Sequence, residues 1–381
     1  MAARTSLVVL AIAAGTAQAD DADIIGRDPG WRVEDVQVRA TYLDQTGHGF
    51  QSQAGELAGP GSEAMWLLQP WTQVKLRQSE RVSHVVTIPV DVVTGASPDA
   101  VDAVSSASRT NESLGVNLRS TYRRTETDTF SLRAGIAAEE PLITATLGGG
   151  WRRSLADDNA SVAVSGVVTY DGFDHRDLHG RFTGPALRWA FNGNIAVSQL
   201  LSPTTIADAS YGITQQEGKL SSGWNAVPAG GGTSLAAEVV PSVRRRHAIT
   251  GRISQHIPVT HSTAKLAYRL YNDDWGIDAH TISADGYQYV TPWMYVRAGY
   301  RFHYQTGARF FTTMFLGNPN DRDPRTADSD LARLHAHEWS VQLVTLRGRT
   351  RPYSVSAELL RYERSNDLAL TAVSLAIGKQ L

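Results

Sequence analysis

The chain has 381 residues, 42% of them hydrophobic, and a formal net charge of −2 at pH 7. This near-neutral charge gives no electrostatic argument for binding nucleic acid, which is therefore not an expected partner. The sequence has no cysteine, which excludes thiol catalysis, cysteine-bound clusters and haem attached through cysteine.

The N-terminus has the features of an export signal. Arg4 precedes the apolar run LVVLAIAAG, and Ala17 and Ala19 place small residues where a signal peptidase cleaves. The run is shorter than the ~20 apolar residues that a membrane-spanning helix needs. We therefore expect residues 1–19 to be a signal peptide and residues 20–381 to form a single exported domain.

The pattern of apolar and polar residues in the rest of the chain predicts β-strands. No later segment reaches ~18 consecutive apolar residues, so no transmembrane helix is expected. Five segments alternate clearly between apolar and polar residues, namely 114–123, 130–139, 263–270, 294–304 and 371–381. In the segment 294–304, Tyr300 and Phe302 lie on one face of the strand, and Arg301 and His303 lie on the other.

Weaker alternation marks the remaining strands. We expect them near 31–42, 64–76, 82–93, 143–153, 161–170, 189–199, 204–216, 246–257, 279–289, 338–347 and 353–362. The fold class is therefore all-β, an antiparallel transmembrane β-barrel of about 16 strands, within a range of about 14 to 18.

The connections between these strands test the barrel independently. Bacterial barrels place both termini on the periplasmic side, with short turns there and long loops outside. The odd connections include long segments such as 44–62, 217–244 and 312–336, whereas even connections such as 77–81 and 201–204 are short. Three odd connections are also short, but the even ones are short throughout, which favours an even-stranded barrel.

A soluble sheet would bury the apolar face and expose the arginines, and alternation alone does not separate these two cases. The polar face carries many long cations that suit a wet lumen, and the apolar face is rich in Tyr and Trp, which suit membrane interfaces. We therefore expect the protein in the bacterial outer membrane, in contact with lipid and lipopolysaccharide.

The polar faces supply the candidate lumen-lining residues. These are Arg119, Arg123, Arg133, Lys265, Arg269, Arg297, Arg301 and His303, with Arg252 as a further cation and Glu139, Asp208, Glu338 and Glu358 opposing them. If water fills the lumen, the excess of cations favours small anions. If the side chains interlock instead, the same residues form a salt-bridged plug.

Three segments of the sequence, in the order in which they occur, resemble segments of a known bacterial protein family. They are DVVTGASPDAVDAVSSAS (91–108), EVVPSVRRRHAITGRI (238–253) and YNDDWGIDAHT (271–281). They are similar to the family catalogued as domain of unknown function 3570, whose members are exported outer-membrane barrels. The motif residues are Asp91, Ser97, Pro98, Asp99, Trp275, Gly276 and His280. The resemblance implies a barrel without a defined activity, and the gene surroundings of the family imply a link to a periplasmic flavin- or redox-dependent system.

The segment 91–108 follows a strand and is expected at the outer rim. Gly95 and Pro98 favour turns, and we expect a compact loop folded into the barrel mouth. A calcium site formed by Asp91, Asp99 and Asp102 and a solvated loop remain the alternatives.

Several histidines are candidates for sites. His175 and His179 have metal-ligand spacing only if their segment is helical, and His335 and His337 share a strand face. A solvated surface is the alternative for both pairs, and no metal or cofactor is expected.

Two charged segments near the outer rim also carry hypotheses. Asp273, Asp274 and His280 could brace a tight turn through hydrogen bonds, with a chemical role for the three side chains as the alternative. The run 243–247 could bind lipopolysaccharide phosphates or form a solvated turn.

Two functional hypotheses remain, neither of them enzymatic, because no nucleophile–base or paired-acid motif is present. The first is a porin-like channel or envelope scaffold with a cation-lined lumen that passes small anions. The second is an accessory barrel that docks a periplasmic redox protein at its short turns.

Overall fold

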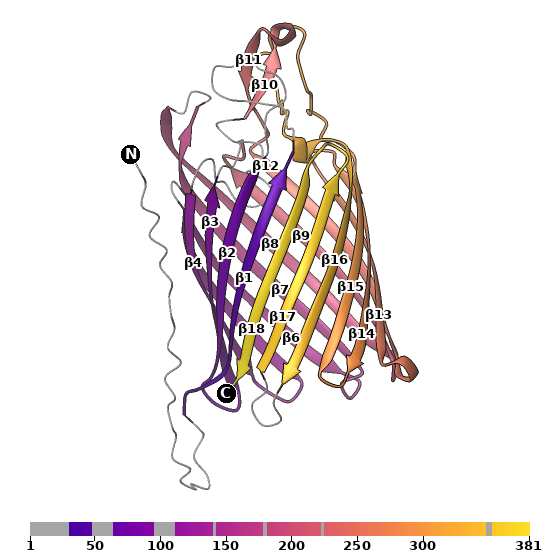
Figure 1. Ribbon diagram of the computed structural model, residues 1–381. Helices are drawn as coiled ribbons and strands as arrows, with labels where there is room; N and C mark the ends of the chain where they lie inside the picture. The colour runs from indigo at the N-terminus through magenta and orange to yellow at the C-terminus, as the bar shows by residue number, and fades with distance from the viewer. Residues whose placement is uncertain are drawn as a thin grey trace, which may run out of the picture.

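The computed structural model describes residues 30–47, 64–94, 111–139, 142–177, 181–221, 225–347 and 353–381. Within these ranges, sixteen antiparallel strands form a closed barrel (Figure 1). The barrel strands are β1 (Arg32–Thr46), β2 (Met65–Arg77), β3 (Val82–Thr94), β4 (Asn111–Arg123), β5 (Asp128–Glu139), β6 (Leu142–Leu155), β7 (Ala160–Arg176), β8 (Phe182–Ser202), β9 (Thr205–Gly218), β12 (Val243–Ile257), β13 (Ser262–Asp273), β14 (Asp278–Thr291), β15 (Met294–Gln305), β16 (Leu334–Arg347), β17 (Tyr353–Arg364) and β18 (Ala369–Gln380).

The barrel closes between its first and last strands. β1 pairs with β18 in antiparallel register, with Val38 opposite Ile377. Closure leaves no strand edge with unpaired backbone groups, which is the condition for a sheet to span a membrane. The predicted barrel and its number of strands are confirmed.

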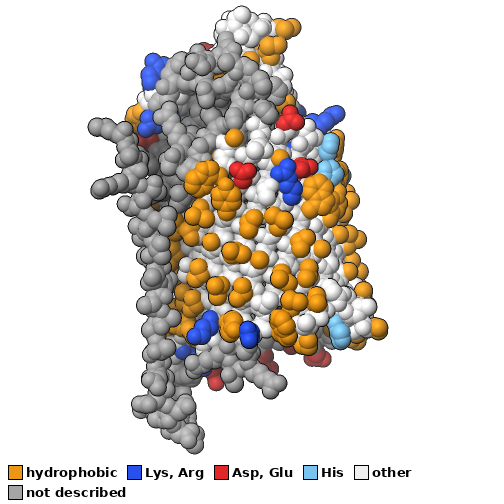
Figure 2. Space-filling model, viewed as in Figure 1, with side chains coloured by type: hydrophobic (Ala, Val, Ile, Leu, Met, Phe, Trp, Pro, Cys, Tyr) orange, Lys and Arg blue, Asp and Glu red, His pale blue; other side chains and the backbone are white. Residues whose placement is uncertain are grey.

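The outer wall of the barrel is apolar. Exposed large hydrophobic side chains recur at every second residue of the strands, as at Leu114, Val116 and Leu118 of β4. Figure 2 shows apolar side chains across the middle of the visible wall, with charged side chains gathered nearer its two ends. The residues between them in sequence face the interior of the barrel, because successive side chains of a strand alternate.

The two ends of the barrel differ. Short turns such as 78–81 and 258–261 join strands at the end where β18 finishes, and the described parts of the connections 219–242 and 306–333 lie at the opposite end (Figure 1). One long connection holds an additional hairpin of β10 (Ala226–Ala229) and β11 (Ser234–Ala237), which the sequence did not predict.

The best-buried hydrophobic residues of the described chain lie mostly at the long-loop end. Trp275, Ile277, Ala308 and Leu331 form one cluster, and Val240 packs against it from another connection. The middle of the barrel therefore has, among the described residues, no apolar core of the kind that fills a soluble sheet protein. Within the same ranges, no helix is long and apolar enough to cross a membrane.

A pair of neighbouring substitutions tests which face meets lipid. Val341 of β16 points outward and is 54% exposed, and Gln342 points inward. We expect Val341→Arg to lower the free energy of unfolding in lipid vesicles by about 2–4 kcal/mol, and Gln342→Arg to change it by about 1 kcal/mol or less. Equilibrium urea titration measures both values, and equal losses in the two variants would contradict the assignment.

Candidate functional site at the mouth and in the lumen

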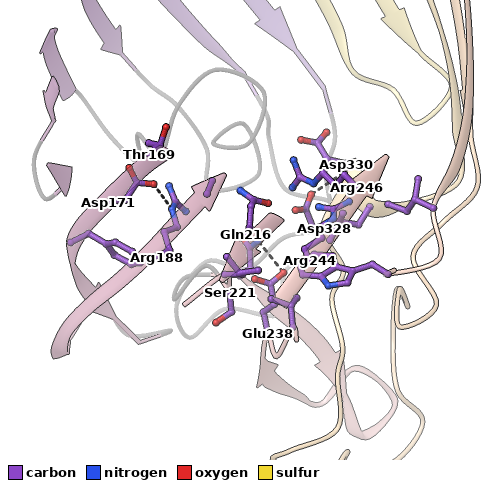
Figure 3. A pocket seen from close by; sticks show the side chains of 18 of the residues that line it. Thr169, Asp171, Arg188, Gln216, Ser221, Glu238, Arg244, Arg246, Asp328 and Asp330 are labelled. Atoms are coloured by element: carbon purple, nitrogen blue, oxygen red, sulfur yellow. Dashed lines mark hydrogen bonds and ion pairs between the residues drawn. The ribbon is translucent and has the colours of Figure 1, made fainter. Parts of the chain in front are cut away.

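A cavity of about 620 Å³ lies at the long-loop end of the barrel. Its wall combines the outer ends of strands with residues of two long connections, 219–242 and 306–333. In Figure 3, Asp171 and Arg188 stand on one side of the cavity, and Arg244, Arg246 and Asp328 stand on the other. Its size is that of a pocket for a small molecule, and charges of both signs line it.

Asp273 organises one side of the cavity. Its side chain is fully buried and accepts hydrogen bonds from Arg244 Nη2 (2.6 Å) and Tyr271 Oη (2.9 Å). Its second oxygen accepts from the backbone N–H groups of Trp275 (3.1 Å) and Ile277 (2.9 Å). A buried carboxylate is stable only with such partners, so Asp273 fixes the turn between β13 and β14 to β12.

The same turn supports an aromatic platform. The Arg244 guanidinium lies over the ring of Trp275, 4.2 Å from its centroid, and Trp275 Nε1 donates to the carbonyl of Val243. Gly276 follows with a φ of 95°, a left-handed conformation that strains other residues. A Cβ at Gly276 would also meet the side chain of Arg309.

Hydrogen bonds join the two long connections to each other. Thr326 Oγ1 donates to Glu238 Oε1 (2.6 Å), and both residues are buried. Arg325, also buried, donates to the carbonyls of Ala237 (2.8 Å) and Asn320 (2.6 Å). The connection 306–333 is therefore held across the mouth by these side-chain contacts together with backbone hydrogen bonds, such as the pair between Val239 and Arg325.

A barrel strand anchors that connection from a second direction. Arg364 of β17 forms an ion pair with Asp330 and donates to Ser329 Oγ at 3.1 Å. Gln305 of β15 donates to the carbonyls of Asp330 and Ala332. These contacts place Asp330 at the cavity wall (Figure 3).

On the opposite wall of the cavity, a second arginine, Arg188, is fixed in place by its contacts. Arg188 Nε donates to Asp171 Oδ2 at 2.7 Å, and its guanidinium lies 5.5 Å from the ring centroid of Phe173. Thr144 donates to the other oxygen of Asp171 at 2.7 Å. The carboxylate and the ring fix the direction of the guanidinium, which lies at the cavity wall.

The structure places the eight candidate lumen residues on inward strand positions. They are Arg119 and Arg123 of β4, Arg133 of β5, Lys265 and Arg269 of β13, and Arg297, Arg301 and His303 of β15. In each strand the neighbouring apolar residues are exposed on the outer wall, as at Leu118, Leu132 and Leu266. Arg269 and His303 also line the mouth cavity.

Several of these cations have acidic partners. Arg297 pairs with Asp285 (2.8 Å) and Glu358 (3.4 Å), and Arg301 lies 3.7 Å from Glu338. The inward Arg252 pairs with Asp208 at 2.9 Å. These four acidic partners lie on β9, β14, β16 and β17, whereas Glu139, the remaining predicted opposing acid, lies on β5.

The remaining cations have no ion-pair partner within the described ranges. Lys265 lies against the ring of Tyr287 and Arg269 against that of Tyr271. Arg119 and Arg133 stand directly opposite each other on β4 and β5. The lumen therefore carries an excess of positive charge among its described residues.

The family-motif residues are only partly brought together. Trp275 and Gly276 belong to the turn that Asp273 fixes. Asp91 lies in the strand β3. Ser97, Pro98 and Asp99 fall outside the described residues, as does the rest of the expected mouth loop and calcium site.

The expected hydrogen-bonded corner forms without its histidine. Asp274 Oδ1 accepts the backbone N–H of Arg245 at 3.0 Å, so both aspartates brace the turn. His280 points to the outer wall instead, where its Nδ1 forms a 2.7 Å hydrogen bond with Tyr268 Oη. The reason is parity, because His280 has the same strand face as the exposed Ile282.

Of the other candidate histidines, His175 forms part of the cavity wall. His335 and His337 face outward, and His337 stacks on Trp339 and bonds Tyr300 Oη. His175 bonds Thr183, and His179 lies outside the described residues. In the described part of the chain, no group of three or more potential ligands could hold a metal ion.

The run 243–247 is neither a continuous patch nor a turn, but the beginning of β12. Its side chains alternate, so Arg244 turns inward to Asp273 and His247 turns outward to Tyr211. The prediction that the whole run forms one phosphate-binding surface is therefore wrong.

The sequence did not predict the cavity residues Asp171, Arg188, Glu238 and Asp330. Asp171 and Arg188 lie on the polar faces of the extended strands β7 and β8, so alternation extended past 170 and before 189 could have found them. Glu238 and Asp330 lie in long connections, where no periodicity indicates which side chains turn inward.

Two adjacent aspartates test the brace at the mouth. We expect Asp273→Asn to lower the free energy of unfolding by about 3 kcal/mol, because it leaves the buried Arg244 without its counter-charge. Asp274→Asn removes an exposed charge but keeps an oxygen that accepts the Arg245 N–H, so it should cost less than about 1 kcal/mol. Urea titration of the two variants measures the difference, and equal costs would show that the buried carboxylate has no special role.

Comparisons with solved structures return outer-membrane proteins at low similarity. The chain is similar to OccK7 (OpdD) of Pseudomonas aeruginosa, with 7% identity, a TM-score of 0.47, and coverage of 92% of this chain and 99% of that one. The outer membrane protein opdK of the same organism has 8% identity and a TM-score of 0.43, with coverage of 92% and 98%.

A mutant of the ferric enterobactin receptor PfeA of Pseudomonas aeruginosa has 12% identity and a TM-score of 0.43, with coverage of 87% of this chain and 54% of that one. The chain thus spans about half the length of the siderophore receptors that it matches. No curated protein matches the sequence.

One family model matches most of the chain. It covers residues 103–367, which include the turn fixed by Asp273, both mouth connections and all eight candidate lumen residues. The chain therefore belongs to the family described as "Protein of unknown function (DUF3570)".

Proposed function

We propose that the protein is a channel of the bacterial outer membrane that favours small anions. The observation that carries the proposal is the set of inward arginines and lysine in a closed barrel with an apolar outer wall. A transmembrane barrel of about sixteen strands is wide enough for an aqueous channel.

The exposure of inward side chains supports a wet lumen. Arg301 and Arg252 face inward, yet their side chains are 47% and 51% exposed. Side chains that interlocked in a plug would cover one another, so these values favour water over a salt-bridged plug. Water and an excess of cations together lower the barrier for anions.

The mouth supports selectivity rather than free passage. The connections 219–242 and 306–333 are tied to each other and to β17, so they narrow the entrance. A solute entering there passes Arg188 and Arg269 at the cavity wall. We do not propose the accessory role, because no contact of the described residues favours it over a channel, and we propose no catalytic role.

Current through planar bilayers tests the channel directly. With a potassium chloride gradient across the bilayer, we expect a reversal potential whose sign shows that chloride permeates more readily than potassium. The double variant Lys265→Glu and Arg269→Glu should move the permeability ratio of chloride to potassium towards or below one, because it reverses two lumen charges. Arg181→Glu, at an exposed ion pair with Asp177 in the connection between β7 and β8, is the control and should leave the ratio unchanged. Absence of conductance, or cation selectivity of the natural chain, would contradict the proposal.

The proposed location has a test of its own. We expect the protein purified from outer membranes to begin at Asp20, because residues 1–19 are removed on export. Intact-mass spectrometry gives the mature N-terminus, and recovery of the full-length chain from the inner membrane would contradict the proposal.

A further inference from the structure

One part of the inner wall has a composition unlike the rest. Three neighbouring rows of inward residues cross the strands β3 to β7. The central row is Val85, Arg119, Arg133, Gly148 and Val167; the row towards the short turns is Ser83, Thr121, Ser131, Gly150 and Ser165; the row towards the long loops is Thr87, Asn117, Gly135, Thr146 and Thr169. We name these three rows the arginine patch.

Two arginines meet at the centre of the patch. Arg119 and Arg133 are direct cross-strand partners, which places their Cβ atoms about 4.5–5.5 Å apart. Like charges directly opposite each other destabilise a sheet. Neither guanidinium has an ion-pair partner in the described part of the chain, in contrast to Arg252 and Arg297 on the other wall.

The surroundings of this pair are rich in hydrogen-bond donors. The flanking rows supply hydroxyl groups, as from Thr121 and Ser131, and the amide of Asn117. None of the three rows contains an acidic residue. Guanidinium and hydroxyl groups without competing carboxylates are the donors that tetrahedral oxyanions prefer.

Glycines lie next to the pair on the inner wall. Gly148 stands beside Arg133 on the inner wall, and Gly150 stands beside Ser131. A Cβ at Gly148 would lie 2.7 Å from Val167 Cγ2, so this position admits no side chain. Gly148 and Gly150 therefore add no side chain of their own next to the guanidinium groups, and Val167 fills the space over Gly148.

We propose that the arginine patch is a binding site for a divalent oxyanion of the phosphate or sulfate class, through which anions pass one at a time. Arg119 and Arg133 supply the charge and the bidentate contacts, and the adjacent hydroxyls complete the coordination. Bound oxyanion neutralises the repulsion between the two guanidinium groups. This inference rests on the proposed anion channel and names the class of solute that the channel selects.

The test uses inorganic phosphate as a blocker of chloride current through the full-length protein in planar bilayers. We expect phosphate to reduce the chloride conductance saturably. Arg119→Gln and Arg133→Gln should each raise the half-blocking phosphate concentration by about tenfold or more, because each removes a charged hydrogen-bonding partner. Arg119→Lys should weaken the block less than Arg119→Gln, since lysine keeps the charge but loses the bidentate geometry.

Arg252→Gln is the matched control, since it removes the same charge from the opposite wall. It should keep the half-blocking concentration within about twofold. Equal shifts in Arg119→Gln and Arg252→Gln would show a general charge effect and overturn the site.

A second measurement separates failure of the site from failure of the channel. Calorimetric titration of the detergent-solubilised protein with phosphate does not need conductance. Binding that Arg119→Gln abolishes supports the site even if no current is seen, in which case only the channel fails. Current without phosphate binding or block overturns the site and leaves the channel standing.

Discussion

Closure of the sheet is the constraint on which the rest of the structure depends. A strand in lipid must satisfy every backbone group through its neighbours, and the pairing of β1 with β18 removes the last edge. Once the sheet is closed, the period of two assigns each residue to lipid or lumen. The outer wall therefore holds residues such as Leu118 and Leu375. The inner wall holds the residues that alternate with them, such as Arg119 next to Leu118 and Ser374 next to Leu375.

The mouth depends on a different kind of interaction. Buried polar side chains position its connections together with backbone hydrogen bonds, such as the pair between Val239 and Arg325. Asp273 fixes the β13–β14 turn, the Thr326–Glu238 contact joins the two long connections, and Arg364 ties one of them to the barrel. These contacts build the wall of the mouth cavity, and further along the barrel β4 and β5 place the cross-strand pair of Arg119 and Arg133 on inward positions.

The sequence predicted the barrel because alternation and connection length report the same topology independently. It placed Arg119 and Arg301 on the polar faces of their strands for the same reason. It did not predict the β10–β11 hairpin, or the inward direction of Glu238 and Asp330, because contacts distant in sequence determine loop conformation. His280 shows a subtler limit: its motif suggested a role in the turn, but strand parity directs it to the outer wall.

The assignment of the two faces is most directly tested with single cysteines, since the chain contains none of its own. In vesicles, a membrane-impermeant anionic thiol reagent should label cysteine at Arg119 and Thr250, which face inward. It should leave cysteine at the adjacent Leu118 and Ile249 unlabelled, because lipid covers those positions. Rapid labelling at Leu118 and Ile249 with protection at Arg119 and Thr250 would contradict the account.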